Sequence, residues 1–542
     1  MRLAPVGTLP AAWWLKIWLP RDVAEMTASV SWLGWLTNNR RNPRSLLHGT
    51  DLTCPPFLAL VQSSFQNLHP CWSLPRRQAA ASLPGRGSKG PFRHQYSAKT
   101  PRHPHMQLQK TSNSLPSARW TSFENWEYNG MKERLLRSFD TLDKDVLIRH
   151  AERIKGQKLA MSDPFSAGQS WICFEMVAED GSLVIARVRL PRHPDILPTV
   201  TEEDENYAIA CEISTMRFVD ENLPAVVVPK VYAYEGPGSQ LATDAGAIYM
   251  LLEGFNGNTL QDVAPDLCSL PVATQKHIMA QWTMVQAQLA TLAFPQIGSI
   301  SDVTESGDPV IGKLSISASE GLVPQGPFST AAEYFTATGE AALRKAGLHD
   351  QDLSHFSRLG ALVFIDIVRN TGLFKESQAC YPLNHMDLGT QNIIVDDKFN
   401  FLGLIDWEFA QAAPWQVNHY PMPFPLLWPD EMIKSALDDP QHIAHRNMSR
   451  QDFARKLYSE KFREAEFVLR EEGRYLGGTF AEVLESPASR VYACFTNLRS
   501  FPEQDAGHVR EMVRLAFGFD RAGTDQYLES INLRQTNICS GR

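Results

Sequence analysis

The chain has 542 residues, which leaves room for several structural units at about 100–200 residues each. Hydrophobic residues make up 43% and charged residues 21%, a balance that excludes a wholly disordered or fibrous chain. No uninterrupted apolar run reaches about 18 residues, so we expect no stable membrane insertion. The eight cysteines lack Cys-x-x-Cys or Cys/His ligand spacing, which favours reduced thiols inside a cell over disulfides or structural zinc.

The net charge of −8 hides an asymmetry between two parts of the chain. Residues 1–120 hold 15 lysines and arginines against three acidic residues, a net charge of +12, whereas residues 121–542 carry −20. Residues 75–118 are rich in Pro, Gly, Ser, Arg and His and too poor in large apolar residues to form a core. We predict that residues 1–120 are a disordered basic extension or an overextended gene model, with a targeting segment as the alternative.

The basic extension also bears on localisation and partners. Pro5, Pro10 and Lys16 interrupt the apolar stretch near the start, which disfavours a secretory signal. An acid-poor front end containing Arg and Ser fits a mitochondrial presequence, but 120 residues is long for one and its amphipathic periodicity is poor. We expect a cytoplasmic protein, with a mitochondrial location as the alternative. No basic module interleaved with aromatic residues is visible, so we expect no nucleic-acid partner.

The first ordered part has the pattern of a small antiparallel sheet. Apolar residues recur at helical spacing in residues 144–155, which predicts an amphipathic helix. Two strand-like runs, 171–180 and 182–190, are joined at Gly181 and predict a hairpin, with the small-residue loop 166–170 leading into it. The remaining predicted elements are a helix over about 205–221 and strands over 225–234 and 247–255.

After Asn258 the pattern becomes helical. The predicted elements are a long helix with a buried face from Val272 to Leu292, a helix over 355–370, a hairpin over 392–407, and C-terminal helices whose faces include Phe453, Leu457, Phe462 and Phe467. We therefore predict an α+β, bilobal fold. A small β-rich N-lobe would span residues 121–258, and a larger α-helical C-lobe would span residues 259–530.

One constellation of polar residues indicates phosphoryl-transfer chemistry. Residues 384–392 contain the pattern H-x-D-x-x-x-x-N with Asp387 and Asn392, and Asp406 follows 19 residues after Asp387. A carboxylate such as Asp387 can orient or accept the proton of an attacking hydroxyl. An amide oxygen from Asn392 and the carboxylate of Asp406 are hard ligands that suit Mg²⁺ bound to phosphates. The predicted hairpin between them would return Asp406 to the same place.

Simpler interpretations exist for each of these residues. Asp387 and Asn392 could cap the strand that follows them, and Asp406 could be a turn carboxylate. We interpret His385 as a structural hydrogen-bonding group that braces the loop, rather than as an acid–base group. Trp407 is expected to pack under the loop that carries Asp406.

On these motifs, residues 123–430 resemble the aminoglycoside phosphotransferase family, particularly its fungal members, which has a protein-kinase-like fold. The resemblance implies that Asp387 is catalytic and that Asn392 and Asp406 bind the metal. It further implies ATP and Mg as cofactors. Glu212 looks like the glutamate of the family's helix C, and the segment from Met250 to Gly254, with Glu253, would lie near the adenine.

Two features depart from the family pattern. The lysine expected at the end of the third strand is replaced by Arg187, with Arg189 as the alternative register. Arginine keeps its charge and can fork onto two phosphate oxygens, but it is bulkier than lysine. Arg187 and Glu212 could instead form an ordinary surface salt bridge. The expected phosphate loop holds one glycine, Gly168, which could also be a plain turn glycine.

We therefore predict an ATP- and Mg-dependent small-molecule phosphotransferase that transfers the γ-phosphoryl group to a hydroxyl. The alternative is a catalytically weak, pseudo-kinase-like scaffold that binds nucleotide or a protein partner. A mitochondrial structural protein is a third possibility that rests on the basic extension alone. The charge of −20 over residues 121–542 suits a cationic hydroxylated acceptor by electrostatic steering, or it serves solubility. The sequence predicts neither the identity of the acceptor nor the oligomeric state.

Overall fold

A computed structural model describes residues 131–193, 199–319, 321–346, 355–375, 380–421, 430–500 and 502–540, together with Leu115 and Ile196. None of the described residues lies within Asp22–Thr111. The predictions for the basic extension and its targeting role therefore fall outside the described residues. In the described part, no helix is both long enough and apolar enough to cross a membrane.

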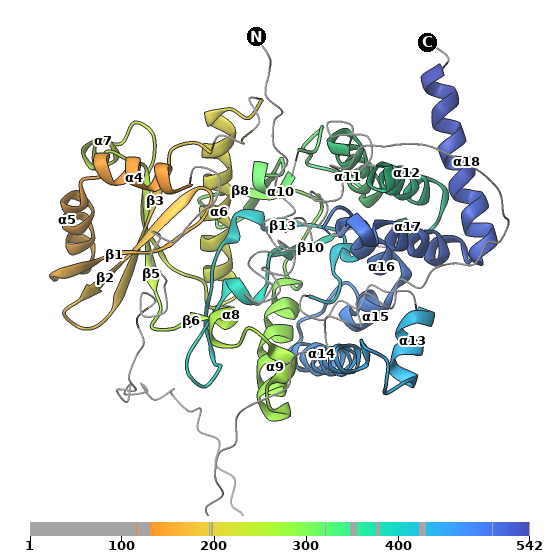
Figure 1. Ribbon diagram of the computed structural model, residues 1–542. Coiled ribbons are helices and arrows are strands. Elements are labelled where there is room, and N and C mark those ends of the chain that lie inside the picture. Colours follow the sequence, from red (N-terminus) through yellow and green to blue (C-terminus); the bar gives the residue numbers. More distant parts are fainter. Residues whose placement is uncertain are drawn as a thin grey trace, which may run out of the picture. The chain divides into compact units, whose positions relative to one another are not determined.

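The first described part is a five-stranded antiparallel sheet with two short helices before it (Figure 1). Its strands pair in the order β1-β2-β3-β5-β4. The elements are α4 (Met131–Thr141), α5 (Lys144–Lys155), β1 (Leu159–Ala167), β2 (Trp171–Ala178), β3 (Leu183–Arg189), β4 (Val231–Glu235), α7 (Gln240–Ala245) and β5 (Tyr249–Gly254).

Helix α5 and the β2–β3 hairpin form where the sequence predicts them. The Asp143 side chain caps α5 by accepting bonds from the amides of Asp145 and Val146, and Gly156 ends the helix with a φ of 67°. Gly181 has a φ of 81° in the turn between β2 and β3, a conformation that costs glycine little. These local signals explain why both elements could be predicted.

At the edges of this sheet, one prediction is wrong and one strand was missed. Residues 225–230 are not part of a strand, because β4 begins only at Val231. Val226 and Val228 are nevertheless buried in the main core, so their apolar character reflects the packing of a loop. Strand β1 also precedes the hairpin and was not predicted, since its register shifts at Pro164 interrupt the regular alternation.

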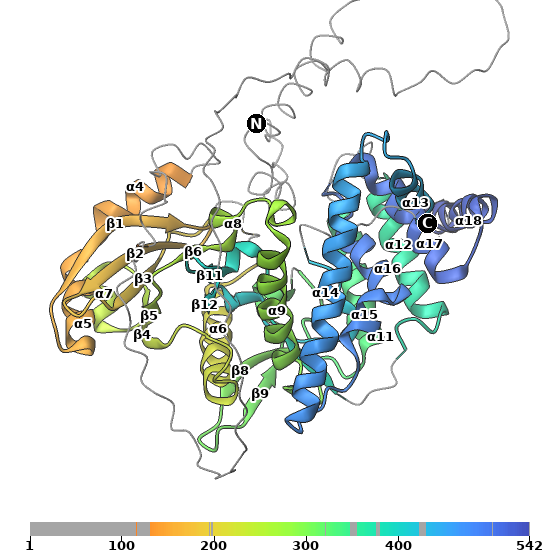
Figure 2. The same cartoon turned by 90° about the horizontal axis from the view of Figure 1, so that it is seen from below.

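Helix α6 (Glu202–Asn222) packs beside the sheet and confirms the helix predicted over 205–221. It starts three residues earlier because Thr201 and Asp204 form a capping box. A hairpin that was not predicted, made of β8 (Ser299–Val303) and β9 (Pro309–Gly312), lies along α6 (Figures 1 and 2).

The remaining described chain is mainly helical, with three small sheets (Figure 2). Its helices are α8 (Leu260–Val263), α9 (Val272–Leu289), α10 (Ile316–Ser319), α11 (Ala331–Ala346), α12 (His355–Asn370), α13 (Asp430–Asp438), α14 (His445–Glu471), α15 (Phe480–Glu485), α16 (Pro487–Thr496), α17 (Pro502–Phe517) and α18 (Arg521–Ser540). Its other strands are β6 (Asn258–Thr259), β7 (Ala293–Phe294), β10 (Tyr381–Asn384), β11 (Ile393–Val395), β12 (Phe401–Leu404) and β13 (Gln411–Ala412).

The α+β class predicted from the sequence is confirmed, and so are the long helix α9, the helix α12 and the hairpin β11–β12. Three side chains assigned to buried or helical faces are in fact exposed: Val272 is 50% exposed, Phe453 is 42% exposed and Phe467 is 59% exposed. The first of these begins its helix, where few neighbours can cover it. The other two lie on α14, whose opposite side packs on α9 and α15.

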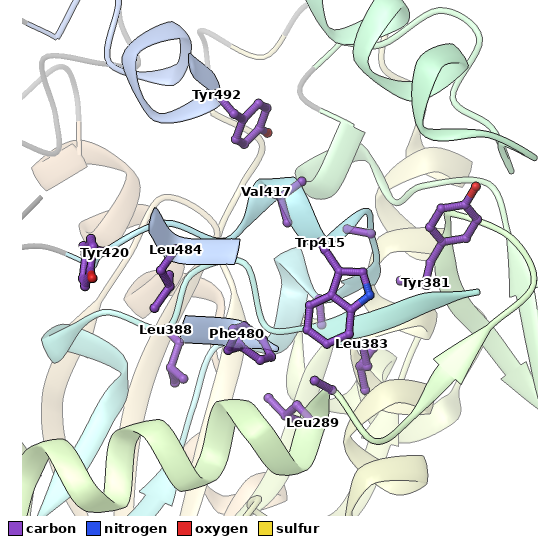
Figure 3. Packing of buried hydrophobic residues seen from close by; sticks show 14 of the residues in the cluster. Leu289, Tyr381, Leu383, Leu388, Trp415, Val417, Tyr420, Phe480, Leu484 and Tyr492 are labelled. Carbon is purple, nitrogen blue, oxygen red and sulfur yellow. The ribbon is translucent and has the colours of Figure 1, made fainter. Parts of the chain in front are cut away.

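A single large cluster of buried apolar side chains joins α6 to the helical part. Figure 3 shows a portion of this cluster, which includes Leu388 from the loop that carries Asp387. Phe480 is at its centre, with its ring 4.5 Å from that of Phe462 and 4.9 Å from that of Trp415. The loop that carries the candidate catalytic residue is therefore anchored in the core.

Two phenylalanines of α14 provide a matched test of this core. Phe462 is fully buried and stacks on Phe480, so Phe462→Ala should lower the free energy of unfolding by about 3–5 kcal/mol. Phe467→Ala, on the exposed side of the same helix, should change it by less than about 0.5 kcal/mol. Urea denaturation of both variants measures the difference. Equal losses would contradict the packing described for α14.

Candidate functional site

The loop before β11 brings Asp387 and Asn392 together. The Nδ2 group of Asn392 donates to the backbone oxygen and to Oδ2 of Asp387, both at 2.8 Å. The Nε2 group of Gln391 donates to Oδ1 of Asp387 at 3.1 Å. The five-residue spacing therefore places both predicted side chains at one site, with the Asp387 carboxylate held by two amides.

This loop is bonded directly to the segment that carries Asp406. His385 Nε2 donates to the carbonyl oxygen of Ile405 at 3.0 Å, and the Ile405 amide donates to the carbonyl oxygen of Asn392 at 3.0 Å. The His385 ring also packs 4.5 Å from the ring of Trp407. Burial lowers the pKa of His385 to about 4, so its ring is neutral and acts as a structural hydrogen-bonding group. The geometry agrees with the structural interpretation of His385 and Trp407.

Two residues of this site have left-handed backbone conformations that non-glycine residues seldom adopt. Asp406 has a φ of 67° and a ψ of 61°, and Met386 has a φ of 62°. Such conformations persist only where the surrounding contacts enforce them, and they concentrate at functional sites. Each lies at or directly beside a candidate carboxylate, which supports a role for this loop pair beyond strand capping.

Arg187 connects the sheet to both helix α6 and the Asp406 segment. Its Nη1 atom lies 2.6 Å from Oε1 of Glu212, and its Nη2 atom lies 3.6 Å from Oδ1 of Asp406. The side chain of Arg187 is 13% exposed and that of Glu212 is 2% exposed, so the pair is not an ordinary surface salt bridge. Arg189 instead pairs with Glu205 at 3.4 Å, which favours Arg187 over the alternative register.

An unpredicted aromatic side chain supports this arginine. Trp171 on β2 is 5% exposed, and the guanidinium carbons of Arg187 and Arg189 lie 5.0 and 5.2 Å from its ring centroid. A tryptophan face attracts cations at this distance. The signal was present in the sequence, since Trp171 begins the first strand of the predicted hairpin, but the partner strand's register was needed to place it.

The described residues of the site supply less positive charge than its carboxylates need in order to ionise normally. Burial and, after it, the nearby carboxylate of Asp406 raise the pKa of Asp387 to about 8, although the hydrogen bonds from Asn392 and Gln391 act in the opposite direction. Burial also raises the pKa of Asp406, although Arg187 acts in the opposite direction. Burial raises the pKa of Glu408 to about 8, with contributions from Asp406 and Glu212. Several carboxylates here thus share one guanidinium within the described part of the chain.

The loop that holds Gly168 is fixed by a residue that the sequence did not identify. Arg134 on α4 is 4% exposed, and its guanidinium donates to the carbonyl oxygen of Gln169 at 2.8 Å and to that of Pro191. Arg134 therefore joins the β1–β2 loop to the end of β3. Gly168 itself has open space around it, because an added Cβ would meet no atom within 4 Å.

Glu253 lies on β5, three positions along the strand from the residue that pairs with Arg187. Its carboxylate Oε2 accepts a bond from the Lys230 amide at 3.3 Å. It pairs with Val184 on β3, whereas the neighbour of Arg187 on β5 is Met250. The Glu253 side chain thus serves the join between β5 and the segment before β4, and a role near an adenine stays a prediction.

The comparisons with known proteins fit this geometry. Residues 187–417 match the model described as "Phosphotransferase enzyme family", and this segment contains Arg187, Glu212, Asp387, Asn392 and Asp406. A protein of Ampulloclitocybe clavipes, "Clavilactone A biosynthesis cluster protein Y", is 22% identical over 298 residues, covering 54% of this chain and 69% of that protein. The resemblance predicted from the motifs is confirmed by this family match.

Two solved structures are similar over a larger share of the chain. The macrolide 2′-phosphotransferase of Brachybacterium faecium is 14% identical with a TM-score of 0.34, covering 70% of this chain and 98% of that one. Amicoumacin kinase, in complex with AMP-PNP, Ca²⁺ and Ami, is 11% identical with a TM-score of 0.34, covering 73% and 93%. Both alignments span nearly the whole length of the other protein's chain.

Two arginines of α4 allow the tie on the β1–β2 loop to be tested. Arg134→Met keeps most of the volume but removes the charge-assisted hydrogen bonds of this buried guanidinium to the carbonyl groups of Gln169 and Pro191, which should cost about 1–3 kcal/mol of unfolding free energy. Hydrogen exchange of the Gly168 and Leu190 amides, which bond across the same loop, should become faster. Arg137→Met, at an exposed position on α4, should change neither quantity. Unchanged exchange in the Arg134 variant would contradict the assignment.

Proposed function

We propose that the protein is an ATP- and Mg²⁺-dependent phosphotransferase that moves the γ-phosphoryl group of ATP to a hydroxyl of a small molecule. The observation that carries the proposal is the convergence of Arg187, Glu212 and Asp406 beside the Asp387–Asn392 pair. In phosphoryl transfer the protein mainly positions the reactants and stabilises charge, and these residue types at these places suit that task.

Asp387 is assigned to the acceptor hydroxyl. Asp387 is half-buried as a residue, and amide donors from Gln391 and Asn392 fix the orientation of its carboxylate. A carboxylate held in this way can accept a hydrogen bond from the attacking hydroxyl, orient the oxygen and take its proton. Leu388, the next residue, is buried in the main core and limits the movement of the loop.

The residues present fit a magnesium ion bound together with phosphates. Among the described residues, no group of three or more His, Cys, Asp or Glu side chains forms a metal cage. Mg²⁺ typically uses one or two protein ligands and completes its shell with phosphates and water, so Asp406 and Asn392 would suffice. The Asn392 amide directs its nitrogen at Asp387, which leaves its oxygen for a cation. A bound divalent cation would supply the positive charge that the raised pKa of Asp406 indicates is lacking.

Arg187 is assigned to the phosphates of ATP. Glu212 holds one nitrogen of its guanidinium, and the Trp171 ring supports its face, so the fork is positioned before a ligand binds. A guanidinium is suited to phosphate because it can donate two parallel hydrogen bonds. The β1–β2 loop with Gly168, which has space for a close approach, would lie over the same phosphates.

The family match and the named relative support a small molecule as the acceptor, but they do not identify the compound. The matched family model describes phosphotransferases, and the Ampulloclitocybe clavipes relative is named for the biosynthesis cluster of a small molecule. The charge of −20 over residues 121–542 would favour a cationic hydroxylated compound through steering. We propose a cytoplasmic enzyme whose N-lobe spans residues 121–258 and whose C-lobe spans residues 259–530.

One observation favours the alternative of a nucleotide-binding scaffold with weak activity. Arg187 stands where the family has lysine, and its Nη2 atom already approaches Asp406 at 3.6 Å. That ion pair competes with a metal for the Asp406 carboxylate. If the competition were strong, the protein would retain the fold and lose efficient transfer.

Replacing the two aspartates separates catalysis from metal binding. Asp387→Asn should lower single-turnover phosphotransfer by at least about 100-fold while leaving Mg-ATP affinity nearly unchanged. Asp406→Asn should instead remove most of the thermal stabilisation by Mg-ATP, because the stabilisation by a ligand falls as its affinity for the folded protein falls. Transfer is measured by ATP consumption with panels of amino-alcohols, sugars and aminoglycosides. Asp397→Asn, at an exposed turn, is the control and should change neither quantity. A fully active Asp387 variant would disprove its catalytic role.

Arg187 distinguishes the enzyme from the scaffold. Arg187→Ala should weaken ATP binding by about 10- to 100-fold, since it removes charge-assisted hydrogen bonds. Glu212→Gln should weaken it less, because the arginine remains but is held less firmly. Arg187→Lys should leave the transfer rate near that of the wild type if the arginine is a tolerated substitute. It should increase the rate if the arginine limits metal binding. Calorimetric titration with ATP, on variants shown to be folded, gives the affinities. Wild-type protein that binds no ATP would overturn the phosphotransferase proposal.

A further inference from the structure

Building on the proposed function, we propose that residues 299–319, here called the brace, are a built-in positioning element for the nucleotide site. The brace contains the β8–β9 hairpin and helix α10. It contacts helix α6, which carries Glu212, and the segment that carries Asp406. Kinase-type phosphoryl transfer requires the corresponding glutamate and metal aspartate to be in place together. The brace would hold them in that arrangement without a ligand.

The brace is fastened to the first half of helix α6. The Lys313 Nζ atom lies 3.0 Å from Oδ1 of Asp204, and the Tyr207 hydroxyl donates to the carbonyl oxygen of Lys313 at 2.8 Å. Gly312 permits this close approach, because an added Cβ would lie 2.4 Å from the Tyr207 hydroxyl oxygen. The contact therefore depends on a specific residue on each side and is more than general apolar packing.

A second contact is made by Ser214, two residues after Glu212 in the chain. The Ser214 hydroxyl donates to the carbonyl oxygen of Ser301 on β8 at 3.4 Å. The brace therefore contacts α6 from Asp204 in its first turn to Ser214 in the turn that carries Glu212. Helix α6 is consequently held along the side that faces β8.

At its other end the brace bonds to the residues that follow Asp406. The Ser315 hydroxyl donates to the carbonyl oxygen of Glu408 at 3.1 Å, and the Ser317 hydroxyl donates to Glu408 Oε2 at 3.0 Å. Ser315 is fully buried, and its amide donates to the hydroxyl of buried Ser299 at 3.0 Å, so this end is anchored to the start of β8. The brace thus bonds both to α6, which carries Glu212, and to the segment that carries Asp406.

The physical consequence is a loop of connections that closes without ATP. Glu212 and Asp406 reach each other through Arg187 on one side and through the brace on the other. Helix α6 also packs directly on residues 407–409 and in the main core, but apolar packing of this kind is not directional. With the brace, movement of α6 would also have to break the bonds of Lys313 and Ser317. The site would therefore be assembled permanently, with no separate activation step.

The test uses two brace variants in the full chain, each with a matched control. Ser317→Ala removes the bond to Glu408, and Lys313→Met removes the ion pair with Asp204. Each should weaken Mg-ATP binding by about three- to tenfold, the effect of losing one hydrogen bond that positions the site. Hydrogen exchange along Glu202–Asn222 should become faster in the absence of nucleotide. The controls are Ser306→Ala in the exposed hairpin turn and Lys398→Met, which should change neither quantity.

A double-mutant cycle separates positioning from simple destabilisation. If the brace acts through Glu212, Ser317→Ala should weaken Mg-ATP binding much less in a Glu212→Gln background than in wild type. Equal losses in both backgrounds, or unchanged affinity and exchange in both brace variants, would overturn the proposal. If the wild-type protein binds no Mg-ATP, the proposed function fails. In that case hydrogen exchange of α6 in the brace variants tests the proposal alone. Faster exchange supports the brace, and unchanged exchange overturns it.

Discussion

The buried contact of Arg187 with Glu212, close to Asp406, is the interaction on which the site depends. A charged pair out of water is costly, and it persists only when both partners remain well paired. Here the pair draws together a strand, a helix and the segment after β12, which are distant in the sequence. Removing either member would leave an uncompensated charge in a poorly solvated place. The position of α6 against the sheet is thus linked to the position of the metal-binding segment.

Much of the site could be predicted because its information is local. The H-x-D-x-x-x-x-N spacing is short enough for one loop, so the pattern alone predicted that Asp387 and Asn392 face one site, and the structure adds the bond between them. The hairpin after it was marked by two apolar runs around a polar turn, which placed Asp406 correctly near the loop. Helix α5 and the β2–β3 turn carried their own capping residues and glycines. In each of these cases the interacting groups lie within about 20 residues of one another, roughly the length of one hairpin.

The parts that could not be predicted depend on contacts between distant segments. Arg134 lies on α4, a helix that was not predicted, and only the fold brings it to the carbonyl groups of Gln169 and Pro191. Residues 299–319 carry small polar side chains with little periodicity, so their role against α6 was not visible. Phe467 was assigned to a helical face from its spacing, but the packing of the neighbouring helices determines which face is buried, and Phe467 is exposed.

Gly168 has a consequence for how this chain can vary. Neither its backbone conformation nor its surroundings require glycine, because φ is not left-handed and a Cβ would meet no neighbour. Folding therefore imposes almost no demand at this position, and any intolerance to larger side chains would come from a bound molecule. A saturation library at position 168, sorted once for expression and once for activity, would give two different profiles. The difference between those profiles would measure the space that the ligand occupies above the loop.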